Sequence, residues 1–157
     1  MHRSYSYRLS PTRAQERALL AWLAATRELY NAALEERRDA WKKQLVRVTA
    51  FDQMHALIEI RRDRPDLATV PILALRGALR RLDKAFVAFF RRCKSGEKPG
   101  YPRFKGRTRW NSLSIDILCG KVPLASGGRR LKVPLLGKVK IRLHRPFEGT
   151  PKALRIT

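Results

Sequence analysis

The chain has 157 residues and a formal net charge of +22, with 35 Lys and Arg side chains against 13 Asp and Glu. No apolar run approaches the roughly 18 residues that a membrane span needs, and no signal-peptide pattern follows Met1. We therefore expect neither a membrane protein nor a secreted one. Cys93 and Cys119 are the two cysteines, and both are expected to be reduced thiols in a cytoplasmic protein.

The positive charge is unevenly distributed along the chain. Residues 91–157 carry 18 of the 35 cations but only 3 of the 13 acids. A surface that is charged only for solubility usually mixes both signs. The excess therefore favours a polyanion, and nucleic acid in particular, as the partner.

The first residues predict a short strand followed by a long helix. Tyr5, Tyr7 and Leu9 alternate with polar residues up to Pro11, as in a strand with one buried face. Thr12 and Gln15 fit a capping box, so a helix should begin here and end near Lys43. Residues 35–39 of this helix are expected to be mostly solvated, and both of its tryptophans are expected in the core. Its apolar positions are Leu19, Trp22, Leu23, Thr26, Tyr30, Ala33, Leu34 and Trp41.

A second helix is predicted between Thr49 and Arg64. Thr49 followed by Asp52 is a typical helix start, and the Arg64-Pro65 pair should end the helix. Its buried face is predicted to contain Phe51, Met54 and Ile58, with the orientation of Leu57 left open. Residues 66–70 are expected to form a short connection to a third helix.

The third helix is the most strongly patterned part of the chain, and Pro71 suits its first turn. An apolar stripe recurs with helical spacing along one side. The opposite side combines cations with very small residues, so that a polyanion could approach closely. The stripe comprises Ile72, Leu75, Leu79, Leu82, Phe86, Phe89 and Cys93, and the opposite side comprises Gly77, Arg80, Arg81, Lys84, Ala88 and Arg91.

A basic, proline-punctuated loop follows this helix, and Glu97 is its only acid between residues 91 and 109. Such a density of cations attracts phosphates through counterion release. Three aromatic residues here, Tyr101, Phe104 and Trp110, could stack on unpaired bases or on a terminal base pair. For Tyr101 and Phe104 the alternative, that they dock the loop on the helices, is favoured. The cations are Arg91, Arg92, Lys94, Lys98, Arg103, Lys105, Arg107 and Arg109.

After residue 110 the apolar pattern changes from helical to alternating, which predicts strands. Leu113, Ile115 and Ile117 should face one way, and Val139, Ile141 and Leu143 should do the same. Residues 126–129 read Ser-Gly-Gly-Arg and predict a hairpin turn between segments 122–124 and 131–133. Residues 154–156 predict a further strand.

Four segments resemble the N-terminal region of the TnpB (OrfB) family, which comprises transposon-encoded, RNA-guided DNA endonucleases. They run from Tyr7 to Glu16, from Ala74 to Arg92, from Lys98 to Lys105 and from Leu131 to Lys140. The proline-flanked loop is the most specific of the four. The resemblance covers almost the whole chain.

The pattern and the resemblance together indicate an α+β fold. The resemblance implies a small β-barrel, incomplete at its C-terminal end, that is interrupted by an antiparallel three-helix lobe. We expect residues 1–10 to form the first strand of this wedge barrel. Residues 11–110 would form the helical recognition lobe with its basic loop, and residues 111–157 would supply the remaining wedge strands.

Catalytic chemistry is not expected on this chain. In the family, a nuclease domain with three metal-binding carboxylates and a zinc ribbon follow the region described above. After residue 90 this chain has only Glu97, Asp116 and Glu148 as acids, and its three histidines are isolated in sequence. Two-metal nucleases need clustered carboxylates. We therefore expect a binder without a metal or another cofactor.

The expected partners are DNA and a guide-type RNA. Two alternatives stay open: a stand-alone DNA- or RNA-binding repressor, or one piece of a nuclease whose other half is separately encoded. Arg76 could contact a guanine edge, although the family's flanking-motif preference does not carry over to this sequence. The candidate binding residues are Arg76, Arg80, Arg81, Lys84, Arg91, Arg92, Lys94, Lys98, Tyr101, Arg103, Phe104, Lys105, Arg107 and Arg109.

Overall fold

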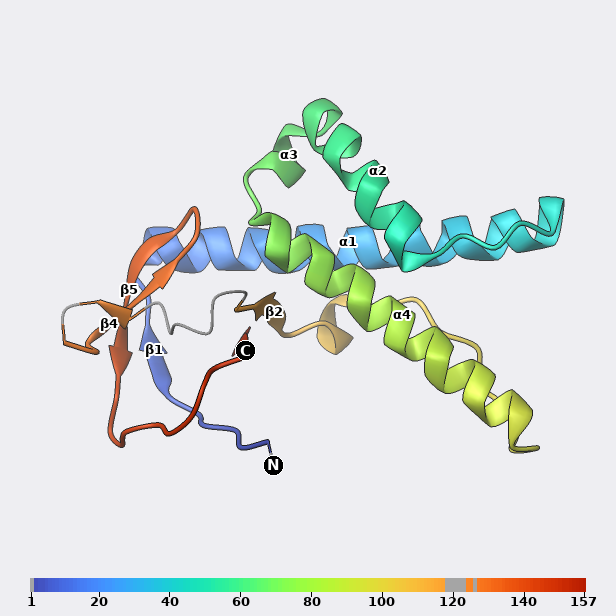
Figure 1. Cartoon of the computed structure of the whole chain (residues 1–157). Helices are drawn as coiled ribbons and strands as arrows, with labels where there is room; N and C mark the ends of the chain where they lie inside the picture. Colours follow the sequence, from blue (N-terminus) through green and yellow to red (C-terminus); the bar gives the residue numbers. More distant parts are fainter. Residues whose placement is uncertain (1, 118–123, 126) are drawn as a thin grey trace.

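The computed structural model describes residues 2–117, 124–125 and 127–157. It is an α+β structure in which helices occupy one side and small antiparallel sheets the other (Figure 1). Cys119, Val122, Pro123 and Ser126, for which the sequence made predictions, lie outside the described residues. The elements are β1 (Arg8–Ser10), α1 (Arg13–Gln44), α2 (Ala50–Asp63), α3 (Pro65–Ala68), α4 (Ile72–Lys94), the 3-10 turn η1 (Arg107–Arg109), β2 (Leu113–Asp116), β3 (Leu124–Ala125), β4 (Arg130–Val133), β5 (Gly137–Arg142) and β6 (Ala153–Ile156).

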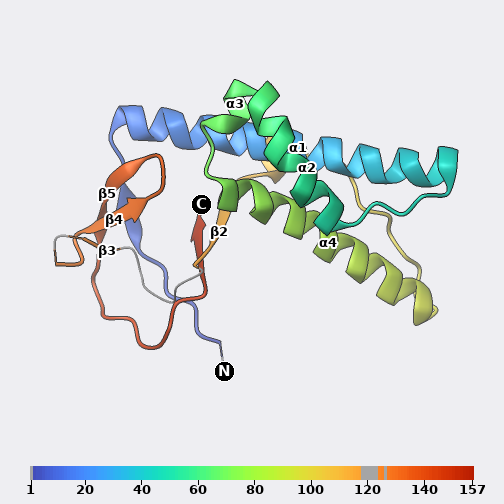
Figure 2. The ribbon, with the colours of Figure 1, turned by 45° about the horizontal axis from the view of Figure 1, so that its top comes forward.

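The predicted capping box begins α1. The Gln15 amide donates to the Thr12 hydroxyl at 3.2 Å, and the Thr12 amide donates to the Gln15 side chain at 3.0 Å. Trp22 is buried as predicted, but the prediction for Trp41 was wrong because its side chain is 58% exposed. The reason is visible in Figures 1 and 2, where the C-terminal end of α1 projects away from α4.

The start of α2 was predicted correctly, but its buried face was not. Gln53 and Leu57 are 5% and 0% exposed, whereas Phe51 and Ile58 are 69% and 50% exposed. A polar contact decides the orientation, because the side-chain amide of Gln53 donates to the Ala33 carbonyl at 3.0 Å and its oxygen accepts from Arg37. Turning α2 to bury Phe51 would leave these groups unpaired inside the protein, which is costly.

Arg37 joins three helices, although residues 35–39 were expected to be mostly solvated. Its side chain is 8% exposed. Its Nε donates to Gln53 of α2 at 2.9 Å, and its Nη1 lies 3.3 Å from a carboxylate oxygen of Asp83 in α4. The guanidinium carbon also lies 5.2 Å from the centre of the Phe86 ring. A single charged side chain of α1 therefore contacts both α2 and α4.

The connection between α2 and α4 contains one more helix than predicted. Pro65 begins the short helix α3, where a missing backbone donor is no disadvantage. One terminal nitrogen of Arg61 donates to the carbonyls of Ala68 and Val70, each at 3.1 Å. These bonds fold the connection back onto α2, so the described residues contain four helices instead of three.

The long helices alternate in direction: α2 runs opposite to α1, and α4 returns across α1 (Figure 1). Leu75, Leu79, Leu82 and Phe86 of α4 are buried, as the apolar stripe predicts. Cys93 was predicted on the same stripe but is exposed. The last turns of α4 extend beyond the helices that cover its first turns. The apolar stripe therefore continues past the point where other helices bury it.

The opposite side of α4 was predicted to face solvent, but part of it packs on β2. Gly77 is buried, and a Cβ atom added there would lie only 2.3 Å from the backbone oxygen of Ser114. Glycine is therefore the residue that lets helix and strand approach this closely. Two residues farther along β2, Asp116 forms an ion pair with Arg80.

The strands form two antiparallel sheets, and neither closes among the described residues. One sheet has the order β1-β5-β4-β3 and the other pairs β2 with β6. Leu9 lies opposite Ile141, and Leu131 lies opposite Val139. The hairpin between β3 and β4 is confirmed where it is described. The barrel is not confirmed, and Tyr5 and Tyr7 precede β1 although the alternation placed them in a strand.

Two faces of the strands were predicted from alternating apolar residues. Leu113 and Ile115 of β2 are buried, in agreement with the prediction, and Ile117 is half-buried. The apolar side of β5 does not continue past the strand, because Val139 is 1% exposed whereas Leu143, directly after β5, is 36% exposed. Within the described part of the chain, no helix has both the length and the apolar character required to cross a bilayer.

Replacing Gly77 with Ala tests the contact between α4 and β2. In an open helix this change stabilises a protein by about 1 kcal/mol. Here we expect the opposite sign, a loss of about 1–3 kcal/mol, because the added methyl group meets backbone. Urea unfolding followed by circular dichroism measures the difference.

Gly100→Ala is the matched control, because nothing lies within 4 Å of a Cβ atom added there. We expect this variant to unfold within about 0.5 kcal/mol of the original chain, as surface substitutions usually do. Equal stabilities for the two alanine variants would show that α4 and β2 do not approach as closely as described.

Candidate nucleic-acid interface

The basic loop lies between α4 and η1 and is held against α1. Asn31 of α1 makes two hydrogen bonds to the backbone of Lys105: its side-chain nitrogen donates to the carbonyl at 3.0 Å, and its side-chain oxygen accepts from the amide at 2.8 Å. An amide side chain matches a peptide group in this way because it offers one donor and one acceptor. The path of the loop is thus fixed shortly before η1.

Aromatic contacts fix the loop closer to α4. The Tyr101 ring stands nearly perpendicular to that of Phe86, at a centroid distance of 5.6 Å, and lies 5.3 Å from that of Phe89. Such edge-to-face pairs are a favourable arrangement of aromatic rings. Burial raises the pKa of the Tyr101 hydroxyl above its ordinary value, and the nearby guanidinium groups of Arg38 and Arg37 oppose this effect. The phenol therefore stays neutral and can both donate and accept hydrogen bonds.

The C-terminal end of the loop enters the core at Trp110. This residue is 4% exposed, and its indole nitrogen donates to the Thr26 hydroxyl at 3.0 Å. The Tyr30 ring lies 5.1 Å away, and the Arg81 guanidinium carbon is 3.8 Å from the centre of the indole ring. Trp110 is therefore a core residue, and the expectation that it could stack on a base was wrong.

Arg81 lies in this packed region and is half-buried. One of its terminal nitrogens donates to the Ser112 carbonyl at 2.9 Å. Arg155 of β6, the strand paired with β2, donates to the Ser112 hydroxyl at 3.0 Å. Burial, and secondarily the charge of Arg155, lower the pKa of the Arg81 guanidinium. Because the Arg81 side chain contacts Trp110 and Ser112, it connects α4 to the start of β2 even if it also contacts nucleic acid.

The other predicted binding residues differ in how available they are. Arg80 is paired with Asp116, and Lys105 is half-buried. The remaining cations of the basic loop and of exposed α4 positions carry no ion pair to an acid of the described residues. These exposed cations are Lys84, Arg91, Arg92, Lys94, Lys98, Arg103, Arg107 and Arg109.

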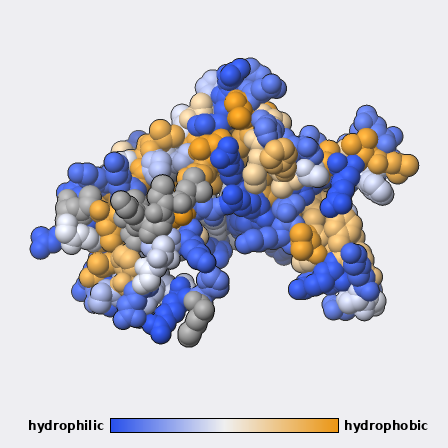
Figure 3. Space-filling view, viewed as in Figure 1, coloured by the Kyte–Doolittle hydropathy of each residue, from blue (hydrophilic) through white to orange (hydrophobic). Residues whose placement is uncertain are grey.

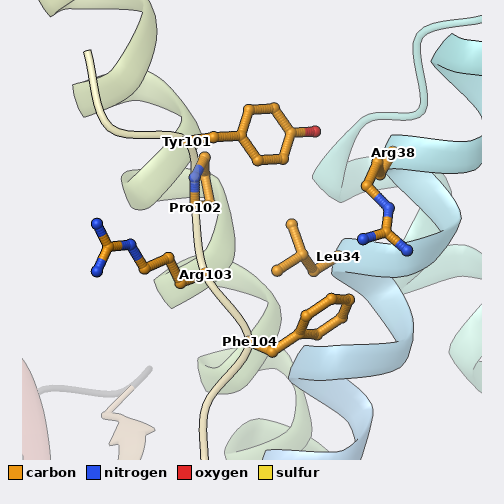
Figure 4. A pocket seen from close by; sticks show the side chains of 6 residues that line it. All are labelled: Leu34, Arg38, Tyr101, Pro102, Arg103 and Phe104. Atoms are coloured by element: carbon orange, nitrogen blue, oxygen red, sulfur yellow. The ribbon is translucent and has the colours of Figure 1, made fainter. Parts of the chain in front are cut away.

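A cavity of about 340 Å³ lies between the loop and α1 (Figure 4). Tyr101 and Phe104 flank it, Leu34 lies between them, and Arg38 closes the side towards α1. The two rings are 43% and 46% exposed. The Arg38 guanidinium carbon lies 5.1 Å from the centre of the Phe104 ring. Unlike Trp110, these two rings are within reach of a ligand.

A second, smaller cleft lies between α2 and α4. Its volume is about 190 Å³, and Arg76 and Arg80 contribute its cationic side. Arg76 is thus separated from the basic loop residues that sequence reasoning grouped with it. The other side is lined by Phe51, Met54 and Ile58, which were predicted to be buried. His55, for which no role was predicted, also lines it.

Sequence reasoning missed the contribution of α1 to this interface. Asn31, Leu34 and Arg38 all contact or face the basic loop. Their spacing of three and four residues places them on one side of a helix. That spacing was visible in the sequence, but it cannot show which side faces a loop more than sixty residues away. Among the described residues, no three His, Cys, Asp or Glu side chains gather as a metal site would require.

The chain is similar in sequence to known proteins of one kind. Residues 1–45 match a helix-turn-helix domain model of the OrfB type. Over 109 residues the chain is 34% identical to a protein of Streptomyces pristinaespiralis named "Putative RNA-guided DNA endonuclease". The alignment covers 68% of this chain and 26% of that protein, so the chain spans about a quarter of the length of the relative it matches.

Changing Asn31 to Ala tests whether α1 holds the basic loop. The change removes both bonds to Lys105. We expect the free energy needed to open the loop to fall by about 1–3 kcal/mol, so that the loop opens more often. Hydrogen exchange of the Lys105 amide should accelerate, whereas exchange in the middle of α4 should stay unchanged. Mass spectrometry of peptic peptides measures both regions in one sample.

Asn111→Ala is the control, because Asn111 is an exposed neighbour of the loop. It should leave exchange at Lys105 as it is in the original chain. Unaltered exchange at Lys105 in the Asn31 variant would mean that the loop is held by other contacts.

Proposed function

Because the chain belongs to the TnpB (OrfB) family, to whose N-terminal region it corresponds, we propose that it binds nucleic acid through the basic loop and the exposed side of α4. The proposal rests chiefly on one observation: eight exposed cations of this region have no acidic partner among the described residues. Cations left free in this way attract phosphates and release the counterions bound to them.

The way the loop is held supports this function. Its backbone is bonded to Asn31, and its Tyr101 ring is packed on α4. A loop that is already ordered loses less conformational freedom on binding than a disordered one. We propose that the cations of the loop are presented in a fixed arrangement instead of being gathered around the phosphates only on contact.

DNA and a guide-type RNA are the proposed partners. The relative from Streptomyces is named as an RNA-guided DNA endonuclease, and a protein of that kind must handle both. We further propose that residues 11–110 form the binding lobe. Residues 1–10 and 111–157 would then belong to the wedge, of which the two small sheets are parts.

We propose binding, and not cleavage, as the activity of this chain by itself. The only acids after residue 90 are Glu97, Asp116 and Glu148. Asp116 is paired with Arg80, whereas Glu148 pairs with Arg3. Since two-metal hydrolysis of a phosphodiester needs carboxylates that converge on the metal ions, these separately engaged acids are poorly suited to it.

Binding that depends on the basic loop should be sensitive to salt. On duplex DNA, we expect the logarithm of the binding constant to fall with the logarithm of salt with a slope of about −5 to −8. Changing Arg103, Arg107 and Arg109 together to Gln should reduce that slope by about two to three units, because each phosphate contact contributes about one. Fluorescence anisotropy titrations at several salt concentrations measure the slope.

A variant with Arg13, Arg17 and Arg62 changed to Gln loses the same charge from exposed positions on α1 and α2. If the loop is the binding region, this control should bind nearly as well as the original chain. A slope near zero for the original chain would remove nucleic acid as the partner, and equal losses in both variants would show that only net charge matters.

The absence of cleavage is a separate expectation. The purified chain, supplied with magnesium or manganese and with RNA, should not cut labelled single- or double-stranded DNA above background, because no carboxylate cluster forms among the described residues. Gel electrophoresis of the labelled strands is the assay. Metal-dependent cutting that disappears in an Asp116→Asn variant would contradict the proposed role.

A further inference from the structure

The cavity between the basic loop and α1 is lined by aromatic and aliphatic side chains, which the attraction of phosphates to cations does not require. Its volume is about 340 Å³, within the range of small-molecule sites in proteins, about 300–1,000 Å³. Two aromatic rings flank a floor formed by Leu34, which is 1% exposed (Figure 4). An aliphatic floor between two rings suits a flat, largely apolar group.

The two rings are kept apart by contacts outside the cavity. Tyr101 is packed against Phe86 and Phe89 of α4. The backbone directly after Phe104 is bonded to Asn31 of α1, through Lys105. Pro102 lies between the rings and restricts the backbone there. The loop therefore cannot close over Leu34 without breaking these contacts, so the cavity belongs to the folded arrangement of the loop.

The charges around the cavity indicate what enters it. Arg38 lies over the Phe104 ring at 5.1 Å, and a guanidinium plane, like an aromatic ring, stacks on nucleobases. Arg103 also lines the cavity, but its guanidinium points away from the other lining residues (Figure 4). A group with a flat body and an anionic attachment satisfies both features, and a nucleotide in a strand is such a group.

The geometry points to a binding site for one unpaired nucleobase: we propose that a base turned out of a bound strand enters between Tyr101 and Phe104, while Arg103 and neighbouring cations hold the adjoining phosphates. The neutral Tyr101 hydroxyl, which lies towards α1 in Figure 4, can donate to or accept from the edge of the base. This inference rests on the proposed nucleic-acid binding and adds a specific ligand for one part of the surface.

Hydrophilic side chains cover much of the face seen in Figure 3, and hydrophobic ones are scattered among them, on the left and at the top as well as near the projecting ends on the right. Exposed aromatic residues are therefore not confined to the cavity. Phe90 of α4 is 49% exposed, close to the 46% of Phe104, but it is not among the residues that line the cavity. It provides a matched control for the loss of an exposed ring.

The test compares two short duplexes that differ at one bulged nucleotide. One carries the fluorescent base aminopurine at the bulge, and the other carries an abasic sugar at the same place. At constant salt, we expect the full chain to bind the aminopurine duplex about tenfold more tightly, because stacking of one base on a protein ring has about this effect. The aminopurine fluorescence should fall on binding. DNA and RNA versions of both duplexes show which strand supplies the base.

Phe104→Leu keeps an apolar side chain but removes the ring, so the two duplexes should then bind within about twofold of one another. Phe90→Leu should keep the full preference. A melting curve of each variant establishes that it is folded. A preference that persists in a folded Phe104→Leu variant would overturn the proposed site.

Photochemical crosslinking from iodouracil at the bulge locates the base without any substitution. The crosslinked peptide should contain Tyr101 or Phe104, and a crosslink confined to another region would contradict the proposal. If both duplexes bind equally well to the original chain, the base site is wrong and nucleic-acid binding stands. If neither duplex binds, nucleic-acid binding itself fails, and the base site fails with it.

Discussion

The contact of α4 with β2 is the constraint on which the rest of the structure depends. Ser114 approaches the backbone of α4 at Gly77, where a side chain would collide with it. A few residues along, Arg81 covers the Trp110 ring and donates to Ser112. The strand is thereby fixed against the helix at two points. Because η1 and the basic loop precede this strand, their C-terminal end is anchored by the same contact.

The loop is consequently fixed at several positions along its length. α4 leads into it, Tyr101 packs back on α4, Asn31 holds Lys105 and Trp110 ends it in the core. Between these points its cations remain exposed. This arrangement explains how a strongly basic segment is ordered without acidic partners among the described residues: the ordering contacts are aromatic and backbone contacts, which leave the charges free.

Much of the fold follows from patterns within single segments. Both capping boxes, the stripe on α4 and the β3–β4 hairpin could be predicted, because each depends on neighbours close in sequence. The errors came from tertiary contacts. Phe51 was assigned to the core because it is apolar, yet Gln53 occupies that position because Arg37 lies opposite. Gly77 appeared to serve a ligand, but its neighbour is Ser114 of β2, which lies 37 residues later in the chain. For the candidate site, the cations of the loop could be predicted from sequence, whereas the share of α1 could not.

Arg37 also restricts how the helices can slide along one another. An interface made only of apolar side chains tolerates a shift of one helix by a full turn, about 5.4 Å. Such a shift costs little stability, because each leucine then packs against another leucine. Arg37 contacts Gln53 of α2 and Asp83 of α4 together, and only one alignment of the three helices allows this. Buried polar groups that select one register in this way are well attested in coiled coils. In this protein the selection extends further, since Asn31 lies on the same helix: a one-turn shift of α1 would carry it out of reach of Lys105. By fixing the alignment of the helices, Arg37 thus also fixes where the loop contacts α1.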